Sequence, residues 1–160
     1  MKKFKKIIAM CLSTMMTVAI VSMPAIAAPS DDSIVPYVHY GSKPTSQTDL
    51  PFNVTMYGVN SDTGLGYSDY YFNCGEACRV ILDMSAVNVQ KKDAGASVTI
   101  TLKNWNNDTD IAEYEFKTDS NGDVIDPLKT VYFSTAQNFY LEIETEPGDV
   151  HFYGYYRLTN

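Results

Sequence analysis

The amino-acid sequence predicts an all-β fold: a two-layer antiparallel β-sandwich of about seven to eight strands, which follows an N-terminal signal peptide. Three observations support this prediction. Apolar and polar residues alternate along most of the chain after residue 51, turn-forming residues separate the alternating runs, and no run shows an apolar period of 3.6 over three turns. Because each such strand has one hydrophobic face, a second sheet has to cover it. A β-barrel is the main alternative.

Residues 1–27 have the features of a secretory signal peptide. Four lysines precede an almost uncharged apolar stretch that runs from residue 7 to about residue 23 and is broken by Pro24. The small residues at 25–28, AIAA, match the A-x-A type that a signal peptidase accepts, so we place the cleavage after Ala27. An uncleaved membrane anchor is the alternative, because about 17 apolar residues are at the lower limit for crossing a bilayer.

The exported chain is strongly acidic. The whole sequence has 12 Lys and Arg side chains against 19 Asp and Glu, and the signal peptide contains four of the basic ones. The net charge is therefore −7 before cleavage and −11 after it. Nucleic acids and anionic membrane surfaces attract clustered lysine and arginine, so the sequence predicts neither as a partner. High solubility outside the cell is the simplest consequence.

The remaining chain of about 133 residues is the size of one domain. Residues 28–51 are rich in Pro, Ser, Thr and Asp, and residues 34–37 form their one apolar cluster. This composition predicts an extended N-terminal arm that contains at most one short edge strand. Residues 52–160 are expected to form the β-sandwich domain.

The alternating runs define the strands of that domain. They are, in chain order, residues 52–57, 80–84, 98–103, 113–117, 131–133, 139–144 and 150–158. In the clearest run, Phe139, Leu141 and Ile143 are expected to face the core. Turn-forming residues separate the runs at 60–64, 106–108, 121–122 and 147–149. The Asn121-Gly122 pair is a hairpin signal.

Two cysteines, Cys74 and Cys78, remain after the signal peptide is removed. In an oxidising compartment two nearby thiols most simply form a disulfide. A redox pair or a zinc site is the alternative. A redox pair usually has two intervening residues, and zinc needs two further ligands, for which the sequence offers His39 and His151 alone. The sequence therefore predicts a structural disulfide, with no metal and no cofactor.

No motif predicts catalysis, and we expect a protein that is not an enzyme. The sequence contains neither G-x-S-x-G nor H-E-x-x-H. Residues 119–123, DSNGD, resemble the start of a calcium loop, but Gly stands fourth instead of sixth. Asp108 and Asp110 could join them in a different calcium site. Glu142 and Glu144 share one strand face, and glycosidase carboxylates are arranged in this way in some β-sandwiches. The same spacing also arises on any strand that has a polar outer face.

The aromatic content is the least ordinary feature, because all 12 Tyr and the single Trp follow the signal peptide. The strand register points five tyrosines away from the core: Tyr57, Tyr132, Tyr140, Tyr153 and Tyr155. Exposed rings can stack on sugars or anchor a protein partner, whereas cross-strand packing stabilises a sheet without binding anything. The candidate ligand-binding residues are Tyr140, Tyr153, Tyr155 and Trp105. Trp105 lies beside a polar turn, where it could equally close one end of the sandwich.

Several short segments follow one another in a characteristic order: the lysine-led signal, IVPY at 34–37, KPT at 43–45, LPF at 50–52 and FYLEI at 139–143. This layout resembles that of small uncharacterised secreted β-sandwich proteins of Gram-positive bacteria. It is also similar in style to β-sandwich modules of bacterial exoenzymes. The resemblance implies export and the fold class. It includes no functional motif, so no site residue follows from it.

The function expected from these observations is non-catalytic binding outside the cell, in the medium or at the cell envelope, by a monomeric or weakly associating protein. The expected partner is cell-wall glycan or an extracellular protein. A glycan-directed hydrolase and a structural protein of the cell envelope are the alternatives. Two carboxylates about 5 to 9 Å apart in a cleft would favour the hydrolase. Tyrosine rings grouped on an open face would favour the binding module.

Overall fold

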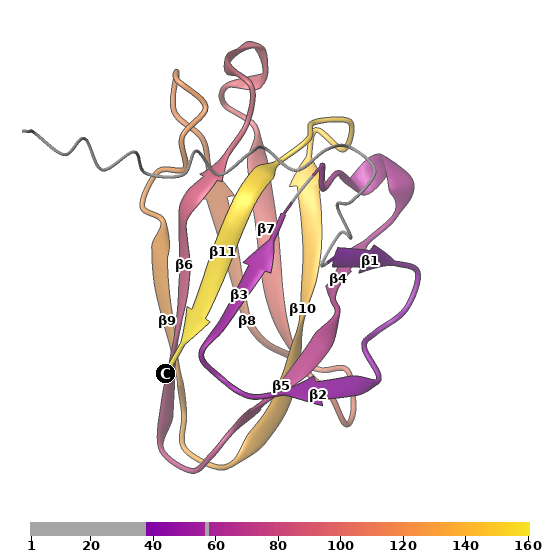
Figure 1. Ribbon diagram of the computed structural model, residues 1–160, viewed down its shortest axis with the longest axis vertical. Coiled ribbons are helices and arrows are strands. Elements are labelled where there is room, and N and C mark those ends of the chain that lie inside the picture. The colour runs from indigo at the N-terminus through magenta and orange to yellow at the C-terminus, as the bar shows by residue number, and fades with distance from the viewer. Residues whose placement is uncertain (1–37, 57) are drawn as a thin grey trace, which may run out of the picture.

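The computed structural model describes residues 38–56 and 58–160, which form eleven strands and two short 3₁₀ helices (Figure 1). The strands are β1 (Val38–Tyr40), β2 (Ser46–Thr48), β3 (Phe52–Thr55), β4 (Gly66–Ser68), β5 (Tyr70–Cys74), β6 (Cys78–Asn88), β7 (Ser97–Asn104), β8 (Asp110–Lys117), β9 (Leu128–Phe133), β10 (Gln137–Glu146) and β11 (Tyr153–Thr159). The 3₁₀ helices are η2 (Ser61–Thr63) and η3 (Lys91–Asp93). The proposed signal peptide, its cleavage site and Tyr57 lie outside the described residues. No helix within the described residues is long and apolar enough to cross a membrane.

The strands form two sheets. The larger sheet has the order β1-β4-β10-β5-β2, and β7 and β8 extend it on the other side of β10. The smaller sheet has the order β3-β11-β6-β9. The pairings between these strands are antiparallel, except that β2 runs parallel to β5. The predicted all-β class is therefore confirmed, and the strands form two separate sheets rather than one closed barrel.

The predicted number of strands, seven to eight, is wrong, because the described residues contain eleven. The seven alternating runs correspond to β3, β6, β7, β8, β9, β10 and β11. The four strands that the pattern missed are β1, β2, β4 and β5, which have only three to five residues each. So few residues are too short a run for alternation to be recognised. β1 and β2 lie in the segment predicted as an arm, and both pair into the larger sheet.

One hydrophobic core contains side chains of both sheets. A row of phenylalanine rings crosses it. Phe133 of β9 stacks on Phe139 of β10 with ring centres 5.3 Å apart, and Phe139 lies 5.4 Å from Phe72 of β5. Phe72 in turn lies 5.5 Å from Phe52 of β3. The row therefore passes from the smaller sheet to the larger one and back again, and it ties the two sheets together.

The alternation predicted for β10 is confirmed on its inner side. Phe139, Leu141 and Ile143 are at most 1 % exposed. Thr145 continues the same side and is 3 % exposed, with its hydroxyl accepting the backbone N–H of Ser61 at 2.8 Å. A polar side chain at the end of the buried row is stable there because it has a hydrogen-bond partner.

A disulfide joins Cys74, at the end of β5, to Cys78, at the start of β6, with the two Cα atoms 5.9 Å apart. The predicted pairing is confirmed. β5 belongs to the larger sheet and β6 to the smaller one, so the bridge closes a tight connection between the sheets. A loop this short contributes about 2 kcal/mol by the loop-entropy relation. The disulfide therefore fixes one connection, and the shared core holds the sheets together.

Residues 119–123 have the geometry of a tight turn. The side-chain Oδ1 of Asp119 accepts the backbone N–H groups of Asn121, at 2.7 Å, and Asp123, at 3.1 Å. These backbone hydrogen bonds lower the pKa of Asp119 below its ordinary value. Beyond the turn, Thr118 and Val124 form a single bridge in place of a hairpin, because β8 and β9 belong to different sheets.

Candidate functional site

The four aromatic residues expected to bind a ligand lie at three separate places. Trp105 and Tyr140 lie together at the β7–β8 turn. Tyr155 lies on the outer face of the smaller sheet, and Tyr153 lies in a groove between two loops. The structure therefore brings two of the four together and separates the others.

The β7–β8 turn, residues 104–109, is shaped by Asn and Asp side chains. The Oδ1 atom of Asn104 accepts the backbone N–H of Asn106 at 2.8 Å. Asp108 is in the left-handed region with φ of 58°, and its N–H donates to the carbonyl oxygen of Asn104 at 2.9 Å. Asn and Asp favour such turns, because their side chains bond nearby backbone groups and tolerate this conformation. The turn is fastened to β10 through the N–H of Trp105, which donates to the carbonyl of Asn138 at 3.0 Å.

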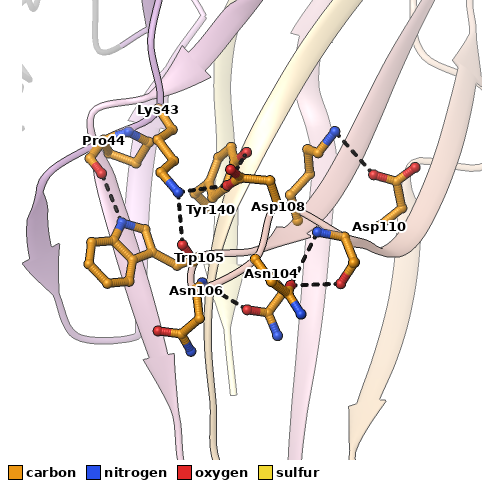
Figure 2. Close-up of polar contacts among 11 residues, drawn as sticks. Lys43, Pro44, Asn104, Trp105, Asn106, Asp108, Asp110 and Tyr140 are labelled. Atoms are coloured by element: carbon orange, nitrogen blue, oxygen red, sulfur yellow. Dashed lines mark hydrogen bonds and ion pairs between the residues drawn. The ribbon is translucent and has the colours of Figure 1, made fainter.

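Lys43 links this turn to the N-terminal segment (Figure 2). Its ammonium group donates to the carbonyl oxygen of Trp105 at 3.0 Å and to Oδ1 of Asp108 at 2.8 Å, and it lies 5.6 Å from the indole centre. The indole N–H donates to the carbonyl oxygen of Pro44 at 2.9 Å, and Tyr71 stacks on the ring with centres 4.5 Å apart. Trp105 therefore fastens residues 43–44 to the larger sheet and leaves little ring surface for a ligand.

Tyr140 is buried beside the same turn, with 3 % of its surface exposed. Its hydroxyl donates to Oδ1 of Asp108 at 3.3 Å, and its ring lies 6.2 Å from that of Tyr67. Burial, followed by the nearby carboxylate of Asp108, raises the pKa of Tyr140 well above its ordinary value, so the hydroxyl stays protonated. The expectation of an exposed ring is wrong for Tyr140, because segments distant in the sequence cover the outer side of β10 at this point.

We call Lys43, Trp105, Asp108 and Tyr140 the clamp, and we expect it to weaken in acid. The hydrogen bond from Lys43 lowers the pKa of Asp108 below its ordinary value. A carboxyl group whose pKa is lower in the folded chain stabilises the fold above its unfolded pKa of about 3.9, and this contribution is lost as the pH falls through the folded pKa. Asp108→Asn should therefore unfold more easily than the wild type at neutral pH, and the difference should disappear in strong acid.

Urea unfolding at a series of pH values measures this effect. Lys43→Gln removes the other partner of the same ion pair, so its stability deficit should fade over the same acidic range. A deficit of Asp108→Asn that stayed constant down to the lowest pH would show that the ionised carboxylate does not contribute to the clamp.

Tyr155 lies on the outer face of the smaller sheet and is 47 % exposed, as predicted. Its position depends on a bulge in β6. Tyr155 pairs with Ala86 and Arg157 pairs with Asp83, so β6 has one extra residue between these pairs. The Oδ1 atom of Asp83 accepts the backbone N–H of Ser85 at 2.9 Å and thereby supports the bulge. The hollow lined by these five residues has about 260 Å³, less than a typical ligand site of about 300 to 1,000 Å³.

Tyr153 lines a larger groove of about 630 Å³. The groove lies between the β6–β7 connection, which includes η3, and the β10–β11 connection. Figure 1 shows both connections at the same end of the molecule, opposite the end where the disulfide joins β5 to β6. The lining residues are Gln90, Lys92, Asp93, Ala94, Gly95, Ala96, Pro147, Asp149, Val150, His151 and Tyr153.

Hydrogen bonds hold the two loops of the groove in place. The hydroxyl of Thr118, a buried residue, accepts the N–H of Gly95 at 3.0 Å and donates to the carbonyl of Ala96 at 3.0 Å. In the other loop the N–H of Val150 donates to the carbonyl of Pro147 at 3.2 Å. Ala96 and Val150 are 4 % and 7 % exposed, so they close the bottom of the groove.

The rest of the groove combines aromatic rings with polar groups. Tyr153 is half-buried, and its ring centre lies 6.1 Å from that of the exposed His151. Asp93 and Asp149 provide carboxylates from different loops, and Lys92 provides an ammonium group. Such a surface offers a ring face, hydrogen-bond acceptors and hydrogen-bond donors to one ligand. It suits a polar ligand better than an apolar one, because an apolar ligand would leave these groups unpaired.

Tyr153 is the one candidate ligand-binding residue from the sequence that lines this groove, and no sequence pattern predicted a ligand site in the loop residues around it. Residues 90–96 have no alternation and no motif, and their place beside the β10–β11 loop depends on how the two sheets connect. The carboxylates singled out from the sequence lie elsewhere. Glu142 lies 3.5 Å from the ammonium of Lys103, and Glu144 is exposed on the outer face of the larger sheet. Neither of them lines the groove.

A calcium site that combines Asp108 and Asp110 with the 119–123 turn does not form. Within residues 38–56 and 58–160, no three His, Cys, Asp or Glu side chains are grouped so that they could hold a metal ion. Asp108 is bound by Lys43 at 2.8 Å, and Asp110 is bound by Lys103 at 3.1 Å. These aspartates therefore serve ion pairs on the outer side of the larger sheet.

No protein-family model matches the sequence, and no curated protein is significantly similar to it.

Proposed function

We propose that the protein is a secreted β-sandwich module that binds carbohydrate in the groove beside Tyr153 and catalyses no reaction. The observation that carries this proposal is the groove of about 630 Å³, in which an aromatic ring lies among carboxylates, an ammonium group and an amide. The lysine-led N-terminus favours export. The Cys74–Cys78 disulfide is consistent with it, because such bonds persist in oxidising compartments.

The chemistry of the groove matches that of a sugar. A sugar ring presents C–H groups on one face and hydroxyl groups around its edge. The ring of Tyr153 can cover the C–H face while the phenol stays in contact with water. Asp93 and Asp149 can accept hydrogen bonds from sugar hydroxyls, and Lys92 and Gln90 can donate to them. The volume of the groove lies within the range of small-molecule sites, about 300 to 1,000 Å³.

The charge of the protein narrows the class of carbohydrate. The exported chain has a net charge of −11, so long-range electrostatic repulsion would oppose the binding of a polyanionic glycan. An uncharged or amino-sugar glycan of the cell wall or extracellular matrix avoids that repulsion. We therefore place the natural ligand among these glycans.

Replacing Tyr153 with alanine should weaken carbohydrate binding about tenfold, since the stacking of one aromatic ring contributes roughly 1 to 1.5 kcal/mol. The measurement is retention of the exported protein on insoluble cell-wall polysaccharide, followed by titration calorimetry with soluble oligosaccharides. Asp149→Asn is a second variant, because Asp149 is exposed and its replacement leaves the core untouched.

Tyr132→Ala is the matched control. Tyr132 is 75 % exposed and lies on β9, away from the groove, so its loss removes the same kind of ring from another surface. Equal retention of the wild type and Tyr153→Ala would contradict the proposal, and so would equal losses in Tyr153→Ala and Tyr132→Ala. Thermal unfolding of each variant separates lost binding from lost folding.

A glycan hydrolase is the second candidate, because two carboxylates, Asp93 and Asp149, line the groove from different loops. Glycosidases use such a pair as acid and base or as acid and nucleophile. The same oligosaccharides distinguish the two functions. Release of new reducing ends that stops in Asp93→Asn and in Asp149→Asn would identify a hydrolase, whereas binding without any cleavage supports the binding module.

A further inference from the structure

Both arginines in the sequence lie on one face of the molecule. Arg79 pairs with Tyr132 across β6 and β9, and Arg157 follows Tyr155 by two residues on β11. Residues two apart on a strand share a face, so all four side chains point outward from the smaller sheet. Tyr132 is 75 % exposed and Tyr155 is 47 % exposed. We call these four residues the Tyr–Arg face.

The Tyr–Arg face is basic in an otherwise acidic protein. The charged residues that the strands of the smaller sheet turn outward are Arg79, Arg157 and Asp83, whereas Lys129 pairs with the buried Leu82 and lies 5.9 Å from the ring of Phe116, on the inner side. The carboxylate of Asp83 is already bound by the N–H and hydroxyl groups of Ser85. Tyrosine and arginine are also the residue types that most often dominate the binding energy of protein interfaces.

The outer face of the larger sheet has the opposite charge. The strands of this sheet contain six acidic residues and two lysines. The register places Glu113 and Glu142 on either side of Thr101, and it places Glu115 and Glu144 on either side of Thr99. Two lines of glutamates therefore flank β7. Glu113, Glu115 and Glu144 are exposed, and Glu115 lies 3.5 Å from the ammonium of Lys117. We call the other two exposed residues, Glu113 and Glu144, the glutamate pair.

The spacing of the opposite charges is similar on the two faces. Arg79 lies four residues before Asp83, the partner of Arg157 on the neighbouring strand, so four residues along the strand and one strand spacing separate the two arginines by roughly 14 Å. The glutamate pair is separated by two strand spacings and one pleat repeat, which is roughly 12 Å. Long arginine and glutamate side chains absorb a difference of about 2 Å.

From this complementarity we infer that the Tyr–Arg face binds the outer face of the larger sheet of a second copy of this chain. The two faces lie on opposite sheets, as Figure 1 shows with the smaller sheet in front. Because the two unlike faces lie on opposite sides of the molecule, each added copy extends the assembly in the same direction, so copies add head to tail into open chains. The acidic face that fits the arginines is present in every copy of the protein.

Size and charge predict a weak association. A sheet of four strands and about seven residues per strand offers roughly 450 Å² per copy, which belongs to the weak, transient class of interfaces. Two copies of net charge −11 also repel each other at long range. Because the Debye length is about 30 Å at 0.01 M salt and about 8 Å at 0.15 M, association should first strengthen and then weaken as salt is added.

Sedimentation of the exported protein over a range of concentrations tests the inference. We expect the mean mass to rise continuously with concentration, past that of a dimer, and to fall again at about 1 M salt. Arg79→Gln with Arg157→Gln removes one face, and Glu113→Gln with Glu144→Gln removes the other. Each double variant should associate about tenfold more weakly than the wild type, because exposed ion pairs contribute little individually and act together here.

A mixture of the two double variants gives the sharpest result. The arginine variant retains the acidic face, and the glutamate variant retains the Tyr–Arg face. Only the contact between these two intact faces can form, so the mixture should give a one-to-one dimer that does not grow further. Lys91→Gln is the control for the arginines, and Asp49→Asn with Glu76→Gln is the control for the glutamates, since these three residues are exposed elsewhere. Both controls should associate like the wild type.

Several results would overturn the inference. One is a wild-type protein that remains monomeric at every concentration and salt tested. Another is a dimer that persists in the glutamate variant, which would mean that two Tyr–Arg faces bind each other. A mixture of variants that stays monomeric, or a control that loses association to the same extent, would also exclude the proposed contact. None of these results depends on carbohydrate binding in the groove.

Discussion

Replacing Phe139 with alanine is expected to lower the free energy of unfolding by about 3 to 5 kcal/mol. Phe139 is fully buried and contacts the rings of Phe133, in the smaller sheet, and Phe72, in the larger one. Its removal leaves a cavity where the two sheets meet, and sheets that are held by backbone pairing relax only partly into such a space. Urea unfolding followed by circular dichroism measures the loss.

A loss of this size is a large part of the stability of a typical domain, about 5 to 15 kcal/mol, so Phe139→Ala could fail to fold. Phe139→Leu keeps most of the volume and should cost less than about 1.5 kcal/mol. Tyr132→Ala, at a ring that is 75 % exposed, should change stability by no more than about 0.5 kcal/mol. Similar values for the three variants would mean that the row of phenylalanines does not hold the sheets together.

Gly154→Ala is expected to be the second most damaging substitution, with a loss of about 3 kcal/mol or more. Gly154 has φ of 115°, a backbone conformation that is strained for any residue with a side chain. A Cβ atom at this position would also collide with the carbonyl oxygen of Ala86 on the neighbouring strand. Neither backbone can easily move away. Gly154 pairs with Val87, and its carbonyl accepts the N–H of Met56 at 2.7 Å.

Gly64 provides the control for this substitution. It has φ of 109°, close to that of Gly154, but a Cβ atom would meet nothing within 4 Å. Gly64→Ala should therefore cost only the backbone strain, about 1 to 2 kcal/mol. The difference between the two alanine variants in thermal or urea unfolding measures the close approach of β11 to β6. Equal losses of stability in Gly154→Ala and Gly64→Ala would show that the backbone angle φ causes the whole loss and that the close approach causes none of it.

The long strands could be predicted from the sequence because each of them has one buried face. Phe139, Leu141 and Ile143 alternate with residues on the outer side of β10, and the period of two follows directly from that arrangement. The disulfide could be predicted as well, since the sequence after residue 27 contains only two cysteines. Short strands such as β1 and β2 could not be predicted, because their place in the sheet depends on partners that are distant in the sequence.

The exposure of individual tyrosines was predicted less well, for the same reason. The alternation correctly places Tyr140 on the outer side of β10, but a strand pattern cannot show that the turn containing Asp108 covers it. The groove beside Tyr153 posed a similar problem. Residues 90–96 and 147–151 meet because two connections cross between the sheets at the same end, and this depends on topology rather than on local sequence.

The direction of β11 determines where a reporter group can be attached. The strand begins at Tyr153, inside the groove, and its seven residues lead away from it over roughly 20 Å. A fluorophore coupled after Asn160 would therefore stay clear of the groove, and a change in its tumbling upon addition of oligosaccharide would test the proposed binding without blocking the groove.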